Sequence, residues 1–267
     1  MSSESLSKKI KIHCLKMANV GGGSHIGSAL SISDILAVLY FDVLKINPKS
    51  PKWDQRDRFI LSKGHAGAAI YACLAELGYF PLKKLKTHYK NGSDLSGHVS
   101  HINVPGVEIS TGSLGHGLSI GVGMATASKI DKKKHKVFVL LSDGECDEGS
   151  IWEAAMFASH RKLNNLVAMI DYNKLQSLET TTETLDLEPF VDKWVSFGWD
   201  VYESDGHSHD SIKASFQKKN INNKPKLIIF HTVKGKGVSF MENAVLWHYR
   251  SPQGEEYERA LKELQSL

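Results

Sequence analysis

Two strongly apolar runs, separated by a stretch with helical spacing, limit what this chain can fold into more than any other feature. Residues 136–142 and 165–171 are rich in β-branched and apolar side chains, and each run breaks into polar turn residues. These properties indicate buried strands that end in turns. Apolar residues between 151 and 158 recur at helical spacing, which gives a strand, a helix and a second strand. Such a unit places both strands parallel in one sheet, so the chain is predicted to be an α/β protein.

Further apolar segments extend this pattern along the chain. Strands are predicted at 59–62, 199–203 and 226–232. Helices are predicted at 66–77, 115–130, 187–197 and 253–264, with two more amphipathic helices before residue 40. The repeated alternation predicts a doubly wound, mostly parallel sheet flanked by helices. No internal repeat, low-complexity tract or linker divides the sequence, so residues 1–267 are expected to form a single domain.

Composition argues against several classes of partner. The 267 residues carry 33 basic and 29 acidic side chains, and a net charge of +4 is too small to indicate a nucleic-acid-binding protein. The sequence has no recognisable signal peptide and no apolar run of membrane-spanning length. Cys14, Cys73 and Cys146 lack metal-binding spacing and are expected to be reduced thiols. The protein is therefore expected to be cytoplasmic, with neither a nucleic-acid nor a membrane partner.

Two histidines close together in a polar turn could be mistaken for metal ligands. His207 and His209 precede another expected helix, for which Ser208 or Asp210 is the expected N-cap. No matching cluster of ligands accompanies the pair, so we do not interpret them as a zinc site.

Polar residues follow the two central apolar runs, at the point where each predicted strand ends. Asp143 and Gly144 follow the first run, and Asn173 follows the second. Ligands of parallel α/β sheets bind at the carboxyl ends of the strands. A carboxylate, an amide oxygen and a nearby main-chain carbonyl suit Mg²⁺ or Ca²⁺ completed by phosphate oxygens, and Gly144 leaves room for a diphosphate. The pair predicts a metal-diphosphate site, although an isolated Asp-Gly is more often an ordinary turn.

The same residues resemble the thiamine diphosphate motif, in which an Asp-Gly after one strand is followed by an Asn after the next. Glu148 and Gly149 complete the pattern Asp-Gly-x-x-x-Glu-Gly. This combination resembles the transketolase family, in particular the amino-terminal, diphosphate-binding half of a transketolase divided between two chains. The resemblance extends over residues 6–264 and implies the thiamine diphosphate-binding α/β fold.

Four histidine segments carry the resemblance further. The loop around His25 resembles the family's Gly-His-Pro-Gly, with Ile26 in place of proline. His65 ends a Leu-Ser-x-Gly-His segment, His98 follows a glycine in a long polar loop, and His248 stands in Trp-His-Tyr near the end of the chain.

Another loop, 110–117, is similar to the family's Thr-Thr-Gly-Pro-Leu-Gly-Gln-Gly. Gly112 and Leu114 are retained, whereas Ser113 replaces the proline and His116 the glutamine.

The resemblance implies three sets of site residues. Those that polarise the ketose carbonyl, move protons or face the partner's active site are His25, His98, His248 and Glu148. Those that bind the cofactor are His65, Gly112, Leu114, Gly144 and Asn173. Those that bind Mg²⁺ or Ca²⁺ are Asp143, Asn173 and the main-chain oxygen of Leu175.

The implied activity is transfer of a two-carbon ketol unit from a ketose or ketose phosphate to an aldose, with thiamine diphosphate as cofactor. In the family, a second domain supplies the glutamate that activates the cofactor's aminopyrimidine ring, and no such domain follows Leu267. A separate C-terminal transketolase subunit is therefore expected, in a two-plus-two assembly with active sites at the interfaces. The chain alone is expected to be inactive.

Three other functions stay open on the sequence. A 2-oxoacid dehydrogenase α subunit or a deoxyxylulose-phosphate synthase relative would use the same cofactor, although the four histidines favour transketolase. A non-catalytic, cofactor-binding partner subunit is the second alternative, because family residues are replaced at 26, 113 and 116. A transketolase-like enzyme of a specialised sugar pathway is the third, motivated by Tyr249, Arg250 and His116.

Overall fold

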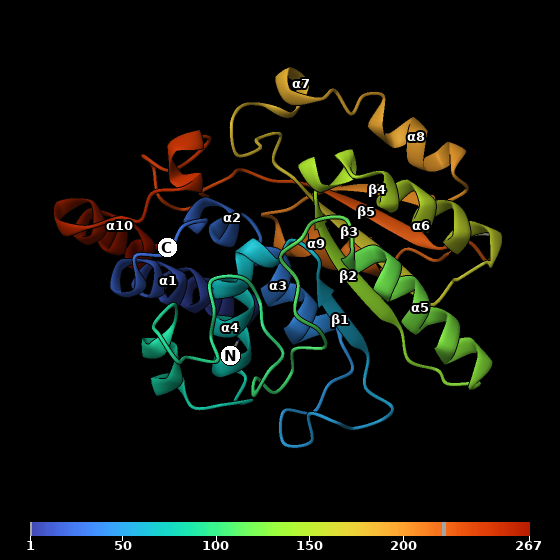
Figure 1. Cartoon of the computed structure of the whole chain (residues 1–267), viewed down its shortest axis with the longest axis horizontal. Helices are drawn as coiled ribbons and strands as arrows, with labels where there is room; N and C mark the ends of the chain where they lie inside the picture. The colour runs from blue at the N-terminus through green and yellow to red at the C-terminus, as the bar shows by residue number, and fades with distance from the viewer. Residues whose placement is uncertain (1, 221–222) are drawn as a thin grey trace.

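In the described part of the chain the central sheet has five strands, all parallel, in the order β1-β2-β3-β5-β4. The computed structural model describes residues 2–220 and 223–267 (Figure 1). The strands are β1 (Arg58–Leu61), β2 (Val137–Ser142), β3 (Leu166–Tyr172), β4 (Asp200–Asp205) and β5 (Lys226–His231). From β3 the chain passes to the edge strand β4 and then returns to form β5 beside β3. The predicted α/β fold with a parallel sheet flanked by helices is confirmed.

Helices connect and cover these strands. They are α1 (Ser3–Gly21), α2 (Ile26–Ser31), α3 (Ser33–Val38), α4 (Gly67–Glu76), α5 (Gly117–Ile130), α6 (Gly149–His160), α7 (Thr181–Thr184), α8 (Phe190–Ser196), α9 (His209–Gln217) and α10 (Gly254–Ser266). Shorter helical turns are η1 (Leu39–Val43), η2 (Gly64–Ala66), η3 (Leu82–Thr87), η4 (Gly144–Asp147) and η5 (Val245–His248). None of the helices in the described ranges is both long and apolar enough to cross a membrane.

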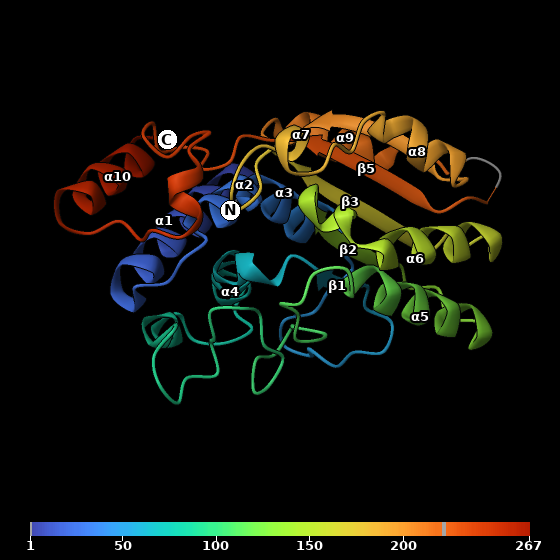
Figure 2. The ribbon, with the colours of Figure 1, turned by 45° about the horizontal axis from the view of Figure 1, so that its top comes forward.

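Alternate strand residues face two hydrophobic cores on opposite sides of the sheet. Phe138 and Leu140 of β2 pack with α1 to α4 and α9. Val139 and Leu141 of the same strand pack with α5, α6 and α8. Figure 2 shows α5 and α6 side by side along the second face. Because both faces of β2, β3 and β5 are buried, these three strands form nearly continuous apolar runs in the sequence.

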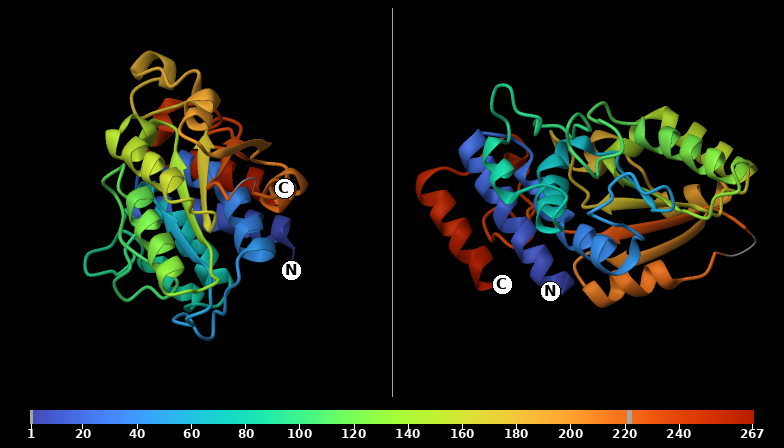
Figure 3. Two further views of the ribbon diagram at one scale, coloured as in Figure 1. Left: turned by 90° about the vertical axis from the view of Figure 1, so that its right-hand side faces the viewer. Right: turned by 90° about the horizontal axis from the view of Figure 1, so that it is seen from below.

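The two ends of the chain meet at one end of the molecule. Helices α1 and α10 lie side by side there (Figure 3). Leu6 and Ile10 of α1 share a core with Ala260 and Leu264 of α10, and all four side chains are fully buried. The amphipathic C-terminal helix therefore closes the first core.

Most of the predicted elements are present, and two differ in detail. The helix expected to run as far as residue 39 is two short helices, α2 and α3, followed by the π-helical turn η1. The helix expected from 187 begins at Phe190 because Pro189 takes the N-cap position in extended backbone, and a residue before proline disfavours the α conformation. Of the two expected caps for α9, Ser208 is the cap, since its side chain accepts a hydrogen bond from the Ser211 N–H.

Candidate active site

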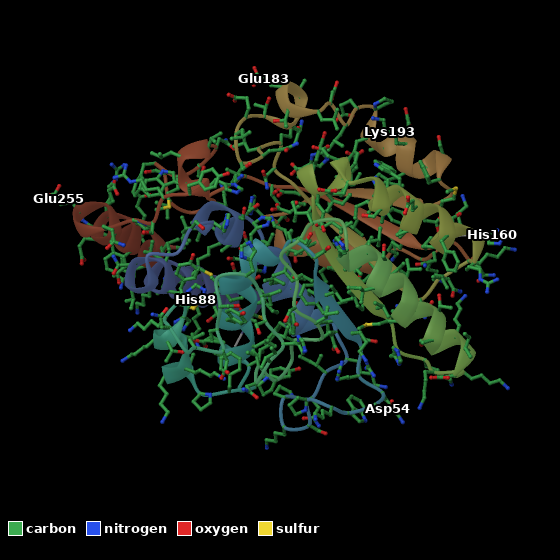
Figure 4. All side chains as sticks on the ribbon, viewed as in Figure 1. Asp54, His88, His160, Glu183, Lys193 and Glu255 are labelled. Carbon is green, nitrogen blue, oxygen red and sulfur yellow. The ribbon has the colours of Figure 1, made fainter. Side chains whose placement is uncertain are left out.

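Four histidines from separate segments meet at the carboxyl edge of the sheet. The ring centroid of His25 lies 5.2 Å from that of His65 and 5.6 Å from that of His98. It lies 4.7 Å from that of His248. By contrast, His160 at the end of α6 lies at the periphery of the molecule, where Figure 4 labels it. The fold thus gathers the four histidines that the resemblance selected.

His25 holds an unusual backbone position at the start of α2. Its φ is +70°, a left-handed conformation that bulky residues rarely adopt, and it is the N-cap of the helix. Its N–H donates a hydrogen bond of 2.7 Å to the carbonyl oxygen of His248. This bond joins the N-terminal loop to η5 across more than two hundred residues of sequence, and it fixes two of the four histidines against each other.

Burial keeps three of these imidazoles uncharged. Burial, followed by the nearby His98 and two lysines, lowers the pKa of His25 to about 4. Burial and the Lys234 ammonium lower the pKa of His248 to about 3, and burial holds the pKa of His65 well below its usual value. Neutral imidazoles can each accept one proton and donate another, which suits proton transfer with sugar hydroxyls.

Oxygen atoms gather beside the histidines, at the ends of β2 and β3. Asp143 is 1% exposed, and its carboxylate accepts hydrogen bonds from the N–H groups of Gly144 at 2.8 Å and Lys174 at 2.6 Å. The Asn173 side-chain oxygen accepts from the N–H of Leu175 at 3.1 Å. Burial, then the neighbouring Asp171 carboxylate, raises the pKa of Asp143 to about 6. A bound cation would offset the free-energy cost of burying a negative charge on the Asp143 carboxylate.

Two buried lysines, which the sequence reasoning did not select, form the positive side of the site. Lys63 is 1% exposed and pairs with the fully buried Asp171 at the end of β3. Lys234 is 2% exposed, and its ammonium donates to the carbonyl oxygens of Leu175 at 2.9 Å and Gln176 at 3.0 Å. Burial lowers the pKa of Lys234 to about 8. A sequence signal existed for Lys63, because it directly follows a predicted strand.

Asp171 is tied to more than one segment of the site. Besides Lys63, it accepts hydrogen bonds from Ser31 at 2.5 Å, from Thr232 and from the Asn173 side chain at 3.0 Å. These bonds orient the amide of Asn173, so that its oxygen and not its nitrogen is directed away from Asp171.

The loop before α5 is held in place by another unpredicted carboxylate. Glu145 is fully buried and accepts hydrogen bonds from the Ser62 hydroxyl, from the Gly115 N–H at 3.0 Å and from the Ser142 N–H at 3.2 Å. Gly115 has a φ of +84°, which favours glycine. Glu145 thereby fixes the loop that carries Gly112 and Leu114.

The histidines, the two lysines and the oxygen ligands at the strand ends line one cavity of about 250 Å³. Its lining includes the predicted residues His25, His65, His98, Gly112, Leu114, Asp143, Gly144, Asn173, Leu175 and His248. Lys63 and Lys234 line it too, and Asp143 is its one carboxylate among the residues described. Two ammonium groups suit a diphosphate, and the carboxylate, amide and carbonyl oxygens are the donor set of Mg²⁺ or Ca²⁺. The residues therefore fit a metal-bound diphosphate cofactor.

Glu148 is the predicted site residue that does not join the others. It is the N-cap residue of α6, its side chain is exposed, and it is absent from the cavity lining. Its predicted role, facing a partner's active site, remains a prediction.

His207 and His209 have a structural environment of their own. The Nδ1 atom of His207 lies 2.8 Å from the buried Asp34 carboxylate, which also binds Lys11. His209 contacts Asp34 at 3.4 Å and Ser3 at 2.9 Å. Their contacts belong to a buried ionic network between α1, α3 and α9.

Comparison with known proteins assigns the chain to a family. The family model described as transketolase, thiamine diphosphate binding domain, matches residues 3–264. A protein of Phocaeicola vulgatus, named as one of the subunits of apulose-4-phosphate transketolase, is 46% identical over 97% of this chain and 92% of the relative. The 6-deoxy-6-sulfo-D-fructose transketolase subunit of Clostridium sp. is 44% identical, over 95% of this chain and 94% of the relative.

Solved structures agree in fold. Transketolase from Campylobacter jejuni superposes with a TM-score of 0.90 at 31% identity, over 99% of this chain and 42% of that one. Transketolase from Leishmania mexicana gives a TM-score of 0.91 at 28% identity, over 99% of this chain and 41% of that one. The chain thus spans about two fifths of these solved transketolases. The chain belongs to the transketolase family of transferases, to its thiamine diphosphate-binding domain.

Proposed function

We propose that this chain is the diphosphate-binding subunit of a two-chain transketolase, which moves a two-carbon ketol unit from a ketose to an aldose. The observation that carries the proposal is one cavity lined by neutral histidines, two buried lysines and the oxygen atoms of Asp143, Asn173 and Leu175. Every relative named above is a transketolase or one of its subunits, which favours this function over the 2-oxoacid dehydrogenase and deoxyxylulose-phosphate synthase alternatives.

Thiamine diphosphate, when bound, supplies the nucleophilic carbon that attacks a ketose carbonyl. In this proposal Asp143, Asn173 and the Leu175 carbonyl hold Mg²⁺ or Ca²⁺, and the cation neutralises the diphosphate. Gly144 has no Cβ, so it leaves its backbone open to the diphosphate. A Cβ there would also approach the Gln176 side chain to 2.9 Å. His65, Gly112 and Leu114 bind along the rest of the cofactor.

The remaining histidines act on the sugar. His25, His98 and His248 line the cavity, and the resemblance gives these three the roles of polarising the ketose carbonyl and moving protons on and off its hydroxyls. The ring centroids of His25 and His98 lie 5.6 Å apart, so both can reach neighbouring oxygens of one sugar chain. The contribution of each group is expected to be a rate factor of roughly 10² to 10⁴.

The proposal includes a partner. The relatives from Phocaeicola and Clostridium are named as subunits, and they match this chain over almost their whole length. We infer a separate C-terminal subunit that completes the active site, a two-plus-two assembly and a cytoplasmic location. Exposed Glu148, at the start of α6, is available to an interface. Within this assembly, residues 1–267 would act as a single domain.

A specialised sugar is the favoured substrate. Tyr249 is 61% exposed, and its ring centroid lies 4.9 Å from that of His248 and 6.4 Å from that of His25. It lines the cavity and narrows the approach to the catalytic histidines. The Phocaeicola and Clostridium relatives are named for apulose-4-phosphate and a sulfofructose, which supports a donor other than the common sugar phosphates.

The test is ketol transfer by the chain co-expressed with a C-terminal transketolase subunit, with thiamine diphosphate and Mg²⁺. The donor panel contains unmodified pentose and hexose phosphates, branched sugar phosphates and sulfonated ketoses. We expect ketol transfer only when both subunits are present. We also expect faster transfer from a branched or sulfonated donor than from an unmodified sugar phosphate. If xylulose 5-phosphate, an unmodified pentose phosphate, reacted as fast as the branched and sulfonated donors, the specialised-sugar proposal would be refuted. Absence of transfer from every donor, with cofactor bound, would favour the non-catalytic alternative.

A further inference from the structure

Lys234 has all three of its hydrogens committed. Besides the carbonyl oxygens of Leu175 and Gln176, its Nζ atom lies 3.0 Å from Nδ1 of His248. An ammonium group has three N–H donors and no acceptor. Three acceptors within hydrogen-bond distance therefore account for all three N–H donors of this group, which lies in the cavity lining and is 2% exposed.

This arrangement fixes the tautomer of His248. Because Lys234 can only donate, Nδ1 of the imidazole must be the unprotonated acceptor, and the ring proton must be on Nε2. The ring itself is also fixed in place. The His248 carbonyl accepts the N–H of His25, and the ring packs against Tyr249 at 4.9 Å between centroids. His248 lines the cavity, and in the described part of the chain no group bonds its Nε2.

His25 differs from His248 in this respect. Its Nδ1 is buried and has no hydrogen-bond partner among the described residues. No hydrogen bond from the described residues therefore selects its tautomer, and His25 can present either a donor or an acceptor to a ligand. The two neighbouring histidines are thus not equivalent.

We propose that Lys234 is a positioning residue that holds His248 as an Nε2–H donor, so that His248 donates a hydrogen bond to a substrate oxygen and does not remove a proton. The role toward substrate rests on the proposed transketolase function, whereas the tautomer does not. Proton removal then falls to His25 and His98. Within one histidine cluster, His248 then has the electrophilic function of a hydrogen-bond donor, and His25 and His98 have the basic function of accepting protons.

The direct test is nitrogen NMR of the full chain labelled with ¹⁵N in its 13 histidines. Signals of His248 are assigned by their loss in His248→Gln. We expect Nδ1 of His248 at the position of an unprotonated ring nitrogen and Nε2 at that of a protonated one, with and without thiamine diphosphate and Mg²⁺. A protonated Nδ1 in the wild-type chain would overturn the proposal, and this result needs no variant of Lys234 and no catalysis.

Variants separate positioning from general stability. Lys234→Met removes the donor and is expected to make the two His248 nitrogen signals converge, as the tautomers exchange. Lys226→Met is the matched control, because Lys226 is also buried and donates to carbonyl oxygens, but at Phe216 and Lys218. It should leave the His248 signals unchanged. A fixed Nε2–H tautomer that survives in a folded Lys234→Met chain would show that Lys234 does not set it.

Activity of the assembled enzyme tests the donor role. His248→Gln retains an N–H donor, whereas His248→Phe has none. We expect His248→Gln to keep at least about tenfold more kcat than His248→Phe, with thiamine diphosphate binding unchanged between them. Equal losses in the two variants, with the wild-type pair active, would contradict the donor role but leave the transketolase function standing. An inactive wild-type pair would instead count against the proposed function.

Discussion

At the scale of single residues, Asp143 carries a charge that the fold buries. Its folded-state pKa is raised to about 6, so between roughly pH 4 and pH 6 the folded state binds more protons there than the unfolded state. The contribution of Asp143 to the free energy of unfolding therefore falls as pH rises through this window. A difference of about two pKa units corresponds to about 3 kcal/mol.

Asp143→Asn should remove this penalty in the absence of metal. The variant's stability relative to wild type is expected to improve by about 2 to 3 kcal/mol between pH 4 and pH 7. Denaturant unfolding at both pH values, with a chelator present, measures the difference. Other buried carboxyls, including Glu145, are common to both proteins and cancel. Identical pH dependence in the two proteins would show that Asp143 does not titrate as described.

Glu145 is expected to be a structural requirement of the site. Glu145→Ala leaves the buried N–H groups of Gly115 and Ser142 without their acceptor and should cost about 3 kcal/mol or more. Glu153→Ala, on the exposed side of α6, is the control and should stay within about 0.5 kcal/mol of wild type. Thermal unfolding of the three proteins is the measurement, and similar midpoints would contradict the assigned role.

The site residues that could be predicted are those with chemically distinctive side chains at recognisable positions in the sequence. The residues that were missed matter because they are buried. Asp143, Asn173 and the histidines stand out because polar residues follow apolar runs or glycines. Lys234 and Glu145 look like ordinary surface charges in the sequence, and only the packed structure reveals that both are buried. Burial is set by contacts between distant segments, which no local pattern contains.

At the scale of elements, two glycines of α5 test how tightly the helix packs on the sheet. A Cβ at Gly121 would lie 2.5 Å from Cγ2 of Val139 in β2, whereas one at Gly123 would meet nothing within 4 Å. Gly121→Ala should therefore destabilise the chain by about 1 to 3 kcal/mol through overpacking. Gly123→Ala should stabilise it by up to about 1 kcal/mol, since alanine is the better helix former. Urea unfolding of both variants checks the opposite signs, and a shared sign would contradict the packing described.

The elements themselves were the most predictable part of the chain. Long apolar runs marked β2, β3 and β5 because strands buried on both faces leave no polar alternation. The break at Ile32, which divides α2 from α3, has no proline or glycine to announce it. The order of the strands was also beyond the sequence, because placing β5 between β3 and β4 depends on tertiary pairing.

At the scale of the whole molecule, this chain forms one side of the proposed active site. This chain supplies the proposed metal ligands, two buried lysines and four histidines at the edge of one sheet. The family resemblance assigns activation of the aminopyrimidine ring to another domain, and the solved transketolases extend well beyond the region that this chain matches. We therefore predict cofactor binding by this chain and catalysis by its assembly with a second subunit.

The most direct measurement is calorimetric titration of thiamine diphosphate into the chain, with and without Mg²⁺ and with and without the C-terminal subunit. Wild type and Asp143→Ala are compared, and Asp131→Ala, an exposed position at the end of α5, is the control. We predict Mg²⁺-dependent binding by wild type and Asp131→Ala, none by Asp143→Ala, and tighter binding when the partner is present. Absence of binding by wild type under every condition, or unchanged binding by Asp143→Ala, would contradict the proposed cofactor site.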